Sequence, residues 1–475
     1  MPTCSRSRLW AVWPILIIFS DVVVSRSICT ENVTMSTAAE AQSLRERCTV
    51  LDGSITLPGN LSESINLDGI EEITGDFMMD FDQHLYSARY YGPPYEISSS
   101  TLKTVGGQIY FGLLDYLLAY PEDYQAPSLG NVSFPSVMNI SAGLQIAAPN
   151  VTYIDLTNLQ YFTFFALATP RLEELKLTSI KGFNDNFHYV HNIDLESIGN
   201  IESIDGLFSE PVNQTSPRND DMIWQNINFG NQTDSIDYVY NRTMTRYPYS
   251  TYANGTAPNL RNLSIGWEHI DTASFINMNL TLTLGATMTE SMKIKYMDLQ
   301  RGVYNLERNR SVQNLTVGSF NARNDFNNTD LVLPFDQVEE VHISSTYLRS
   351  VTIPQQAENW ARPVFELHAT NLRLDNSTTW HWPLKFESLV IEAGVITDDF
   401  FESFLERKTE IVSDFLIVDH SKTLDCSKLN KKVHNKSGWT FHCEGINESN
   451  VALSITVSRT LGLWALSLAI IPLLW

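Results

Sequence analysis

The stretch Cys48-Thr-Val-Leu-Asp-Gly-Ser-Ile-Thr-Leu57 contains the motif that decides the fold of this chain. Its core, Leu51-x-Gly53-x-Ile55, recurs as Ile73-Thr-Gly75-Asp-Phe77, as Val105-Gly-Gly107-Gln-Ile109 and more loosely as Ile140-Ser-Ala142-Gly-Leu144. Successive copies begin 22, 32 and 35 residues apart, at positions 51, 73, 105 and 140. Repeats of this period are typical of solenoids, in which each coil of the chain packs only against its neighbours.

A second pattern, proline followed by apolar residues at +2, +5 and +7, begins at Pro135, Pro149, Pro170 and Pro258. Proline ends the incoming loop, and the alternating apolar residues predict a short strand facing a core. Echoes without the proline include Leu195-x-x-Ile198, Ile201-x-x-Ile204, Val312-x-x-Leu315-x-Val317, Val338-x-x-Val341-x-Ile343, Leu348-x-x-Val351-x-Ile353 and Phe386-x-x-Leu389-x-Ile391. We therefore expect a mainly β solenoid, either β-helical or leucine-rich-repeat-like. A β-sandwich would show turn signals every 8–12 residues or so, and the strands predicted here are more widely spaced.

The pattern divides the chain into two solenoid halves, at 28–205 and 257–447. The interval 206–256 lacks it and is rich in Asn, Asp and Tyr, which predicts either a flexible linker or an ordered, glycosylated insertion. A solenoid of 475 residues needs no second domain, since it grows by adding coils.

The first 27 residues have the order of a secretory signal peptide. Arg6 and Arg8 precede an apolar run from Leu9 to Phe19, and small polar residues lead to a cut after Ser27. Asp21 interrupts the run too early for a membrane anchor, which needs about 20 apolar residues.

The last residues have the order of a glycosylphosphatidylinositol (GPI) signal: small residues at Asn450-Val-Ala452, a polar spacer, and an apolar tail from Leu461 to Trp475. We expect 451–475 to be removed and the lipid attached at Asn450, with Asn447 as the alternative. A tail-anchored span instead would place Arg459 in the hydrocarbon, at a cost of several kcal/mol.

Four cysteines remain after the signal peptide, and four allow three pairings. We predict Cys29 with Cys48 and Cys426 with Cys443, because each pair closes a short loop at one end of the chain. Such a bridge stabilises its loop by roughly 3 kcal/mol. Thr37-Ala-Ala-Glu40 is a capping box, so a helix carrying Cys48 is expected to cover the first coil.

Seventeen Asn-x-Ser/Thr sequons predict a glycan-covered extracellular protein. They lie at Asn32, Asn60, Asn131, Asn139, Asn150, Asn213, Asn231, Asn241, Asn254, Asn262, Asn279, Asn309, Asn314, Asn327, Asn376, Asn435 and Asn447. The formal charge of −22 argues against binding to nucleic acid or to anionic lipid headgroups.

The chain resembles the fungal GPI-anchored cell-wall organisation and sporulation-specific proteins in four features. These are the paired cysteines around Cys48-Thr-x-Leu-x-Gly-x-Ile, the repeated rungs, the segment from Asp425-Cys426 to Phe441-His-Cys443, and the GPI tail. That resemblance implies a receptor-L-domain-like, single-stranded right-handed β-helix and a non-enzymatic role in wall architecture. This chain departs from such proteins in lacking a long Ser/Thr-rich stalk after Cys443, which favours a body held close to the membrane.

Two acidic pairs, Asp220-Asp221 and Asp398-Asp399, are the candidate catalytic carboxylates of a glycan-active enzyme, because polysaccharide-cleaving β-helices place carboxylates on neighbouring rungs. Asp398-Asp399 precedes a helical pattern, where acids favour the helix start. His188-x-x-His191 lacks the spacing of a zinc protease, and we predict surface histidines, no metal and no cofactor.

Aromatic residues supply the candidate glycan contacts, because their rings stack on sugars. The candidates are Tyr90, Tyr91, Tyr95, Trp380 and Trp382. The alternative is that these side chains pack onto the solenoid wall.

The sequence thus predicts a non-enzymatic, GPI-anchored glycoprotein on the outer leaflet of a fungal plasma membrane, with a structural or binding role in cell-wall organisation or spore-wall assembly. Its expected partners are wall glucan or other wall glycoproteins. The alternative function is a β-helical glycan-active hydrolase or lyase at the cell surface.

Overall fold

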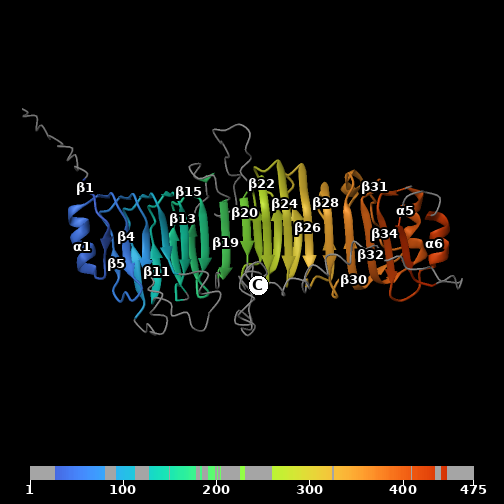
Figure 1. Ribbon diagram of the computed structural model, residues 1–475, viewed down its shortest axis with the longest axis horizontal. Coiled ribbons are helices and arrows are strands. Elements are labelled where there is room, and N and C mark those ends of the chain that lie inside the picture. The colour runs from blue at the N-terminus through green and yellow to red at the C-terminus, as the bar shows by residue number, and fades with distance from the viewer. Residues whose placement is uncertain are drawn as a thin grey trace, which may run out of the picture.

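A computed structural model describes residues 27–80, 93–112, 128–148, 150–177, 182–183, 191–197, 201, 204, 225–229, 259–323, 326–407, 409–433 and 440–446. The molecule is elongated, and the chain advances along its long axis from α1 (Ala38–Arg47) at one end to α6 (Cys426–Val433) at the other (Figure 1). The predicted signal peptide and GPI signal lie outside the described residues, apart from Ser27.

One parallel sheet of 16 strands runs the length of the molecule. Its strands, in spatial order, are β2 (Val33–Thr34), β4 (Ile55–Pro58), β7 (Phe77–Asp80), β10 (Gln108–Phe111), β13 (Gly143–Ala147), β16 (Phe164–Ala168), β19 (His191–Ser197), β20 (Gln225–Phe229), β22 (His269–Ile276), β24 (Ser291–Gln300), β26 (Asn314–Arg323), β28 (Gln337–Ser344), β30 (Val364–Leu374), β32 (Ser388–Ile396), β34 (Asp414–Asp419) and β35 (Thr440–Glu444). We call this the long sheet. Because spatial order follows chain order, each coil adds one strand, and the predicted mainly β solenoid is confirmed.

Shorter parallel sheets form the other sides. In the first half these are a seven-stranded sheet, β1 (Ile28–Cys29), β3 (Val50–Leu51), β6 (Glu72–Ile73), β9 (Thr104–Val105), β12 (Asn139–Ile140), β15 (Tyr161–Phe162) and β18 (Gly182–Phe183), and a five-stranded sheet, β17 (Glu174–Leu177), β14 (Tyr153–Leu156), β11 (Leu129–Ser133), β8 (Tyr95–Ser98) and β5 (Ile65–Asn66). In the second half they are β21 (Asn262–Ile265), β23 (Asn279–Leu284) and β25 (Val303–Arg308), then β27 (Asp330–Val332) with β29 (Ser350–Thr352), and β31 (Lys385–Phe386) with β33 (Glu410–Ile411).

The repeated motif occupies one place in successive coils. Leu51 pairs with Ile73, Ile73 with Val105, and Val105 with Ile140, and all four side chains are fully buried. The unequal spacings of the motif are therefore taken up outside these paired strands. Burial of each apolar side chain in such a row contributes roughly 1.5–3 kcal/mol.

The glycine of the motif lies where adjacent coils approach most closely. Gly75 N–H donates to the Gly53 carbonyl at 2.9 Å, and Gly107 N–H donates to the Gly75 carbonyl at 2.9 Å. A Cβ at Gly53 would lie 2.1 Å from the Glu31 carbonyl oxygen, far inside van der Waals contact. Ala142 holds the equivalent place and still bonds to the Gly107 carbonyl at 3.0 Å, so only some coils require glycine.

The long sheet continues through the interval that was predicted to divide the solenoid. Strand β20 lies within 206–256, and pairs in parallel with β19 on one side and β22 on the other. The division into two halves is therefore wrong at residues 225–229. The alternating pattern of Gln225-Asn-Ile-Asn-Phe229 is short, which is why its sequence signal was missed. The rest of the interval lies outside the described residues.

The N-terminal cap forms as predicted. The Thr37 side chain accepts from Glu40 N–H, the Glu40 carboxylate accepts from Thr37 N–H, and the helix ends at Cys48. Ala41 and Leu44 are buried against the first coil. The disulfide of Cys29 with Cys48 is present, so strand β1 and the helix are tied together.

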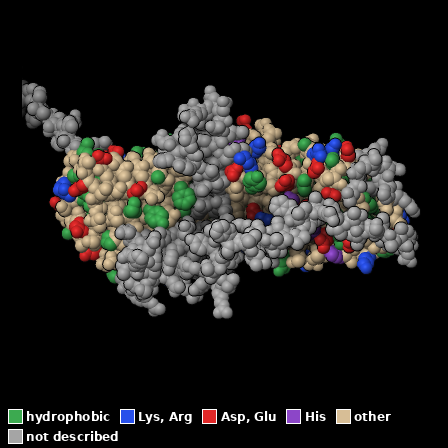
Figure 2. All heavy atoms as spheres, viewed as in Figure 1, with side chains coloured by type: hydrophobic (Ala, Val, Ile, Leu, Met, Phe, Trp, Pro, Cys, Tyr) green, Lys and Arg blue, Asp and Glu red, His purple; other side chains and the backbone are tan. Residues whose placement is uncertain are grey.

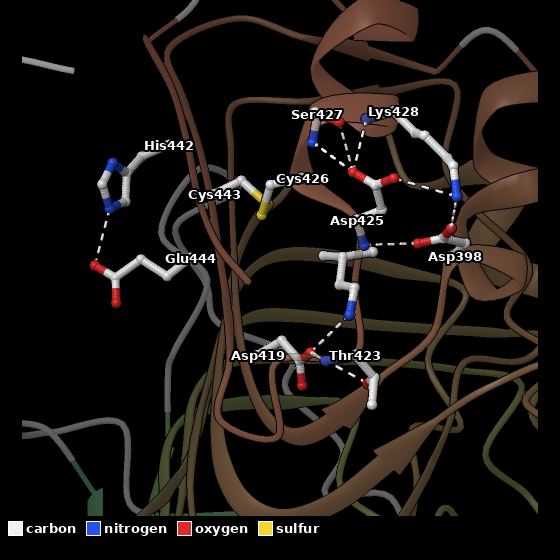
Figure 3. Close-up of a disulfide and its surroundings, with 11 residues drawn as sticks. Asp398, Asp419, Thr423, Asp425, Cys426, Ser427, Lys428, His442, Cys443 and Glu444 are labelled. Carbon is white, nitrogen blue, oxygen red and sulfur yellow. Dashed lines mark hydrogen bonds and ion pairs between the residues drawn. A yellow bond between two sulfur atoms is a disulfide. The ribbon is translucent and has the colours of Figure 1, made fainter. Parts of the chain in front are cut away.

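The C-terminal cap is held by the second predicted disulfide, Cys426 with Cys443, and by two buried carboxylates (Figure 3). Asp425 accepts from Ser427 N–H at 3.0 Å and so begins α6, and the hydrogen bonds from Ser427 and Lys428 lower its pKa to about 2. Asp419, only 2% exposed, accepts from Leu424 N–H at 2.8 Å and Ile396 N–H at 3.1 Å. Burial opposes ionisation of Asp419, but these hydrogen bonds outweigh it and lower its pKa.

The glycine contact gives the first prediction. Gly53→Ala should lower the free energy of unfolding by roughly 1–3 kcal/mol, since the added methyl group forces two coils apart. The matched control, Ala142→Gly, removes a methyl group at the equivalent place and should cost about 0.5–1 kcal/mol. Denaturant unfolding of both variants measures the difference. Equal effects would contradict the close approach.

The second prediction concerns the C-terminal cap. Asp419→Ala should cost roughly 1–3 kcal/mol, because the buried backbone N–H groups of Leu424 and Ile396 lose their acceptor. Asp414→Ala, at an exposed position of the same strand, should change stability by less than about 0.5 kcal/mol. The wild-type contribution of Asp419 is present above the ordinary Asp pKa of 3.8 and is lost as the pH falls. If Asp419→Ala and Asp414→Ala unfold at the same denaturant concentration, this role of Asp419 is excluded.

Candidate functional surface

The outward side chains of the long sheet from β24 to β35 form the surface we call the outer face. Its most prominent members are Tyr296, Asn321, His342, Glu366, His368 and Glu392. They alternate along each strand with inward side chains of the core, such as the buried Val341 and Ile343 in β28. Figure 2 shows histidine and acidic side chains exposed over the C-terminal half of the molecule.

His342 is held between two carboxylates. Its Nδ1 lies 3.0 Å from Glu366 Oε2 on the next strand, and its Nε2 lies 3.7 Å from Glu340 Oε2 on its own strand. The hydrogen bond with Glu366 raises the pKa of His342, against the opposing effect of partial burial. The same bond lowers the pKa of Glu366. Both charged forms are therefore favoured together.

Glu392 joins two histidines. Its Oε2 lies 2.7 Å from His368 Nδ1 on β30, and its Oε1 lies 2.8 Å from His420 Nε2, directly after β34. The hydrogen bond with His368, then that with His420, lowers the pKa of Glu392 although partial burial opposes this. One carboxylate thus bridges three successive coils.

The outer face also carries an exposed aromatic ring and a further His–Glu contact. Tyr296 in β24 is 53% exposed. At the far end, His442 Nε2 lies 2.9 Å from Glu444 Oε1 in β35 (Figure 3). The surface therefore combines hydrogen-bonding groups with one ring available for stacking.

Towards the middle of the long sheet the outward positions are covered. Ala166 and Ala168 in β16 are at most 1% exposed, and Ser274 in β22 is also buried. Outward side chains are accessible towards both ends of the sheet: Gln108 in β10 is exposed, and in the C-terminal half the side chains of His342 and His368 are 33% and 43% exposed.

The sequons avoid the long sheet. Among its described strands only Asn314, the first residue of β26, is a sequon asparagine. The shorter sheets carry four, Asn131, Asn139, Asn262 and Asn279, and the remaining described sequons lie between strands at Asn32, Asn60, Asn150, Asn309, Asn327 and Asn376. None of these eleven asparagines is buried. Sequons at Asn213, Asn231, Asn241, Asn254, Asn435 and Asn447 lie outside the described residues.

Three of the five candidate glycan contacts belong to the core, and that prediction is wrong for them. Tyr95, Trp380 and Trp382 are 3%, 4% and 1% exposed. Trp380 donates to the Val351 carbonyl at 2.8 Å, and Trp382 donates to Ser403 Oγ at 3.1 Å. The alternative, packing onto the solenoid wall, is confirmed for these three. Tyr90 and Tyr91 lie outside the described residues.

An aromatic cluster explains the burial of the two tryptophans. Trp382 packs against Phe400, Phe401 and Phe404, with ring centroids 5.1–6.3 Å apart. His381, between the tryptophans, faces outward and contacts Glu358, as strand-like alternation requires.

The acidic pair Asp398-Asp399 begins a helical segment, as predicted. It starts η2 (Asp398–Phe401), which leads into α5 (Glu402–Glu406). Asp398 accepts from Asp425 N–H at 2.8 Å and lies 3.3 Å from Lys428 Nζ, so it links this segment to the C-terminal cap (Figure 3). Asp220, Asp221 and His188 lie outside the described residues, as does the side chain of His191 in β19.

Within the described ranges, no group of three His, Cys, Asp or Glu side chains is arranged to hold a metal ion. The helices in the same ranges are each too short or too polar to cross a membrane.

The helix η1 (Gln355–Asn359) supplies Glu358, the carboxylate that contacts His381. Hydrogen bonds from Arg407 and then from His381 lower the pKa of Glu358 to about 2.

Comparison of the chain with protein-family models, with curated proteins and with solved structures found no match. Membership of the fungal wall-protein family therefore stays a prediction.

The histidines of the outer face were not predicted. Their sequence signal is a recurring Glu-x-His: Glu340-x-His342 and Glu366-x-His368 lie 26 residues apart, and Glu392 follows after another 26. One coil here is two residues shorter than this spacing, so the histidine of each copy lies opposite the next glutamate: His342 pairs with Glu366, and His368 pairs with Glu392.

Proposed function

We propose that this protein is a GPI-anchored, N-glycosylated surface protein with a structural and binding role in fungal cell-wall organisation, and that its outer face contacts wall glucan. The proposal assigns it to the extracellular side of the plasma membrane. The order of segments at both ends of the sequence and the two disulfides support a secretory route, since disulfides persist in oxidising compartments.

The observation that carries the binding role is the distribution of sequons. Glycans are bulky and solubilising, so a surface that must contact another polymer is expected to lack them. The long sheet is the largest regular surface of the molecule, yet its described strands hold one sequon, at the start of β26. The much smaller sheets hold four.

The chemistry of the outer face suits a polysaccharide. Carboxylate, imidazole and amide groups alternate along it, and sugar hydroxyls both donate and accept hydrogen bonds. Tyr296 adds an exposed ring beside Ser319 on the next strand. This ring replaces Trp380 and Trp382 as the candidate for stacking.

A glycan-active enzyme is the alternative, and one observation favours it. Glu340 and Glu366 lie on adjacent coils and both contact His342. A glycosidase, however, needs one carboxylic acid with a raised pKa to protonate the leaving group. The pKa of Glu366 and that of Glu392 are lowered instead, so these groups are poor general acids and binding is the better supported function.

The anchor is tested by release from intact cells. We expect a phosphatidylinositol-specific phospholipase to release the protein, and a variant lacking 461–475 to appear in the medium without treatment. Retention after phospholipase treatment, together with a C-terminal peptide that carries no lipid by mass spectrometry, would sink the anchor assignment.

The outer face is tested by adding a glycan to it. Arg323→Thr creates a sequon at Asn321, whereas Glu307→Thr creates one at Asn305, on an exposed position of β25. Arg323→Ala removes the same arginine without a new sequon. We expect the glycan at Asn321 to reduce retention of the purified protein on isolated walls or wall glucan at least about tenfold, because it covers the contact surface. The glycan at Asn305 and the Arg323→Ala change should leave retention unchanged.

Occupancy of both new sequons must be verified by mass spectrometry. Retention that is insensitive to an occupied Asn321 would exclude the outer face as the contact surface, whatever the fate of the anchor.

A further inference from the structure

Three His–Glu contacts link four successive coils on one side of the molecule. They join His342 of β28 to Glu366 of β30, His368 of β30 to Glu392 of β32, and Glu392 to His420, which follows β34. Each contact crosses from one coil to the next, so it opposes their separation. Lys and Arg take no part in these three contacts, which distinguishes them from the permanently charged pair of Lys295 with Asp271.

The groups around His342 favour its protonated form. On the β26 side, His342 faces Asn321, and the nearby Arg323 lies 3.7 Å from Asp298. On the other sides, the charged groups of the described residues that it meets are Glu340 and Glu366.

The second histidine and its carboxylate have similar surroundings. His368 faces Ser344 on β28 and Glu392 on β32. Glu392 faces Val418 on β34, beyond which Glu444 of β35 contacts His442.

We propose that these contacts include a pH-dependent clamp: in mild acid, protonated His342 holds the coils of β28 and β30 together through its carboxylate partners, and at neutral to alkaline pH its deprotonation loosens this part of the solenoid. The device needs no ligand and does not depend on the proposed function.

The direction of the pH dependence follows from the pKa shifts of the histidine and of its carboxylate partners. The pKa of His342 is raised by its bond to Glu366, so its contribution is complete below the ordinary value of 6.5 and is lost as the pH rises through the raised pKa. The pKa values of Glu366 and Glu392 are lowered, so their contributions are present above the ordinary 4.5 and are lost as the pH falls. The clamp is therefore strongest between about pH 4.5 and 6.5.

The first half supplies an internal control. Residues 93–177 contain no histidine, although their coils are joined by the same parallel hydrogen bonds. Any difference in pH response between the two halves thus reports on side chains rather than on the shared backbone.

The test is hydrogen exchange by mass spectrometry on the purified whole protein at pH 5.5 and 7.5, corrected for the pH dependence of intrinsic exchange. We expect peptides from 337–374 to open about fivefold less often at pH 5.5, since a partly exposed ion pair changes an equilibrium by roughly two- to fivefold. Peptides from 143–168 should change by less than about twofold.

Two variants assign the effect. His342→Gln keeps a polar side chain that cannot become charged, and should remove most of the pH response in 337–374. The matched control, His381→Gln, should leave the response intact, because Glu358 keeps Arg407 at 2.7 Å. An unchanged response in His342→Gln would overturn the clamp. If that variant does not fold, the wild-type protein decides: an equal pH response in 143–168 and 337–374 overturns the proposal.

Discussion

The structure depends on the parallel hydrogen bonding of each coil to the next. Once Leu51, Ile73, Val105 and Ile140 are aligned, every other position in those coils is fixed, because strand register allows no slip of one residue without turning the core outward. The same constraint explains the glycines, since Gly53 and Gly75 lie where the backbones of adjacent coils nearly touch. It also explains why the long sheet is continuous through β20.

A stack of identical coils leaves an open edge at each end, where unpaired backbone groups and apolar side chains would meet water. This chain closes both edges with a helix and a disulfide, α1 with Cys29 and Cys48, and α6 with Cys426 and Cys443. At the C-terminal end, Asp419 also binds backbone N–H groups that the last coils leave unpaired. Stacking of the coils also repeats one surface along the molecule. As a result, Glu366 contacts His342 of the preceding coil, and His368 contacts Glu392 of the following coil.

Sequence patterns predicted part of the strands, both caps and the helical start at Asp398, because each depends on local spacing. They did not predict β22 to β25, β30 or β34, which carry none of the motifs. They misplaced Trp380 and Trp382, although alternation across His381 already assigns the two rings to one side and the imidazole to the other. Aromatic content alone does not tell a core ring from an exposed one. The histidine contacts were missed for a different reason. His342 and Glu366 are 24 residues apart, whereas Glu392 and His420 are 28 apart, so these contacts can be predicted only when the length of each coil is known, and that length varies along this chain.

The central claim is one continuous capped solenoid whose outer face carries no glycan between β28 and β35. Cryo-electron microscopy of the glycosylated protein tests this most directly. We expect a single unbroken stack of coils, with glycan density on the shorter sheets and between strands, and a bare outer face around His342 and Glu392. A break between β19 and β22, or glycan density lying over that face, would contradict the account.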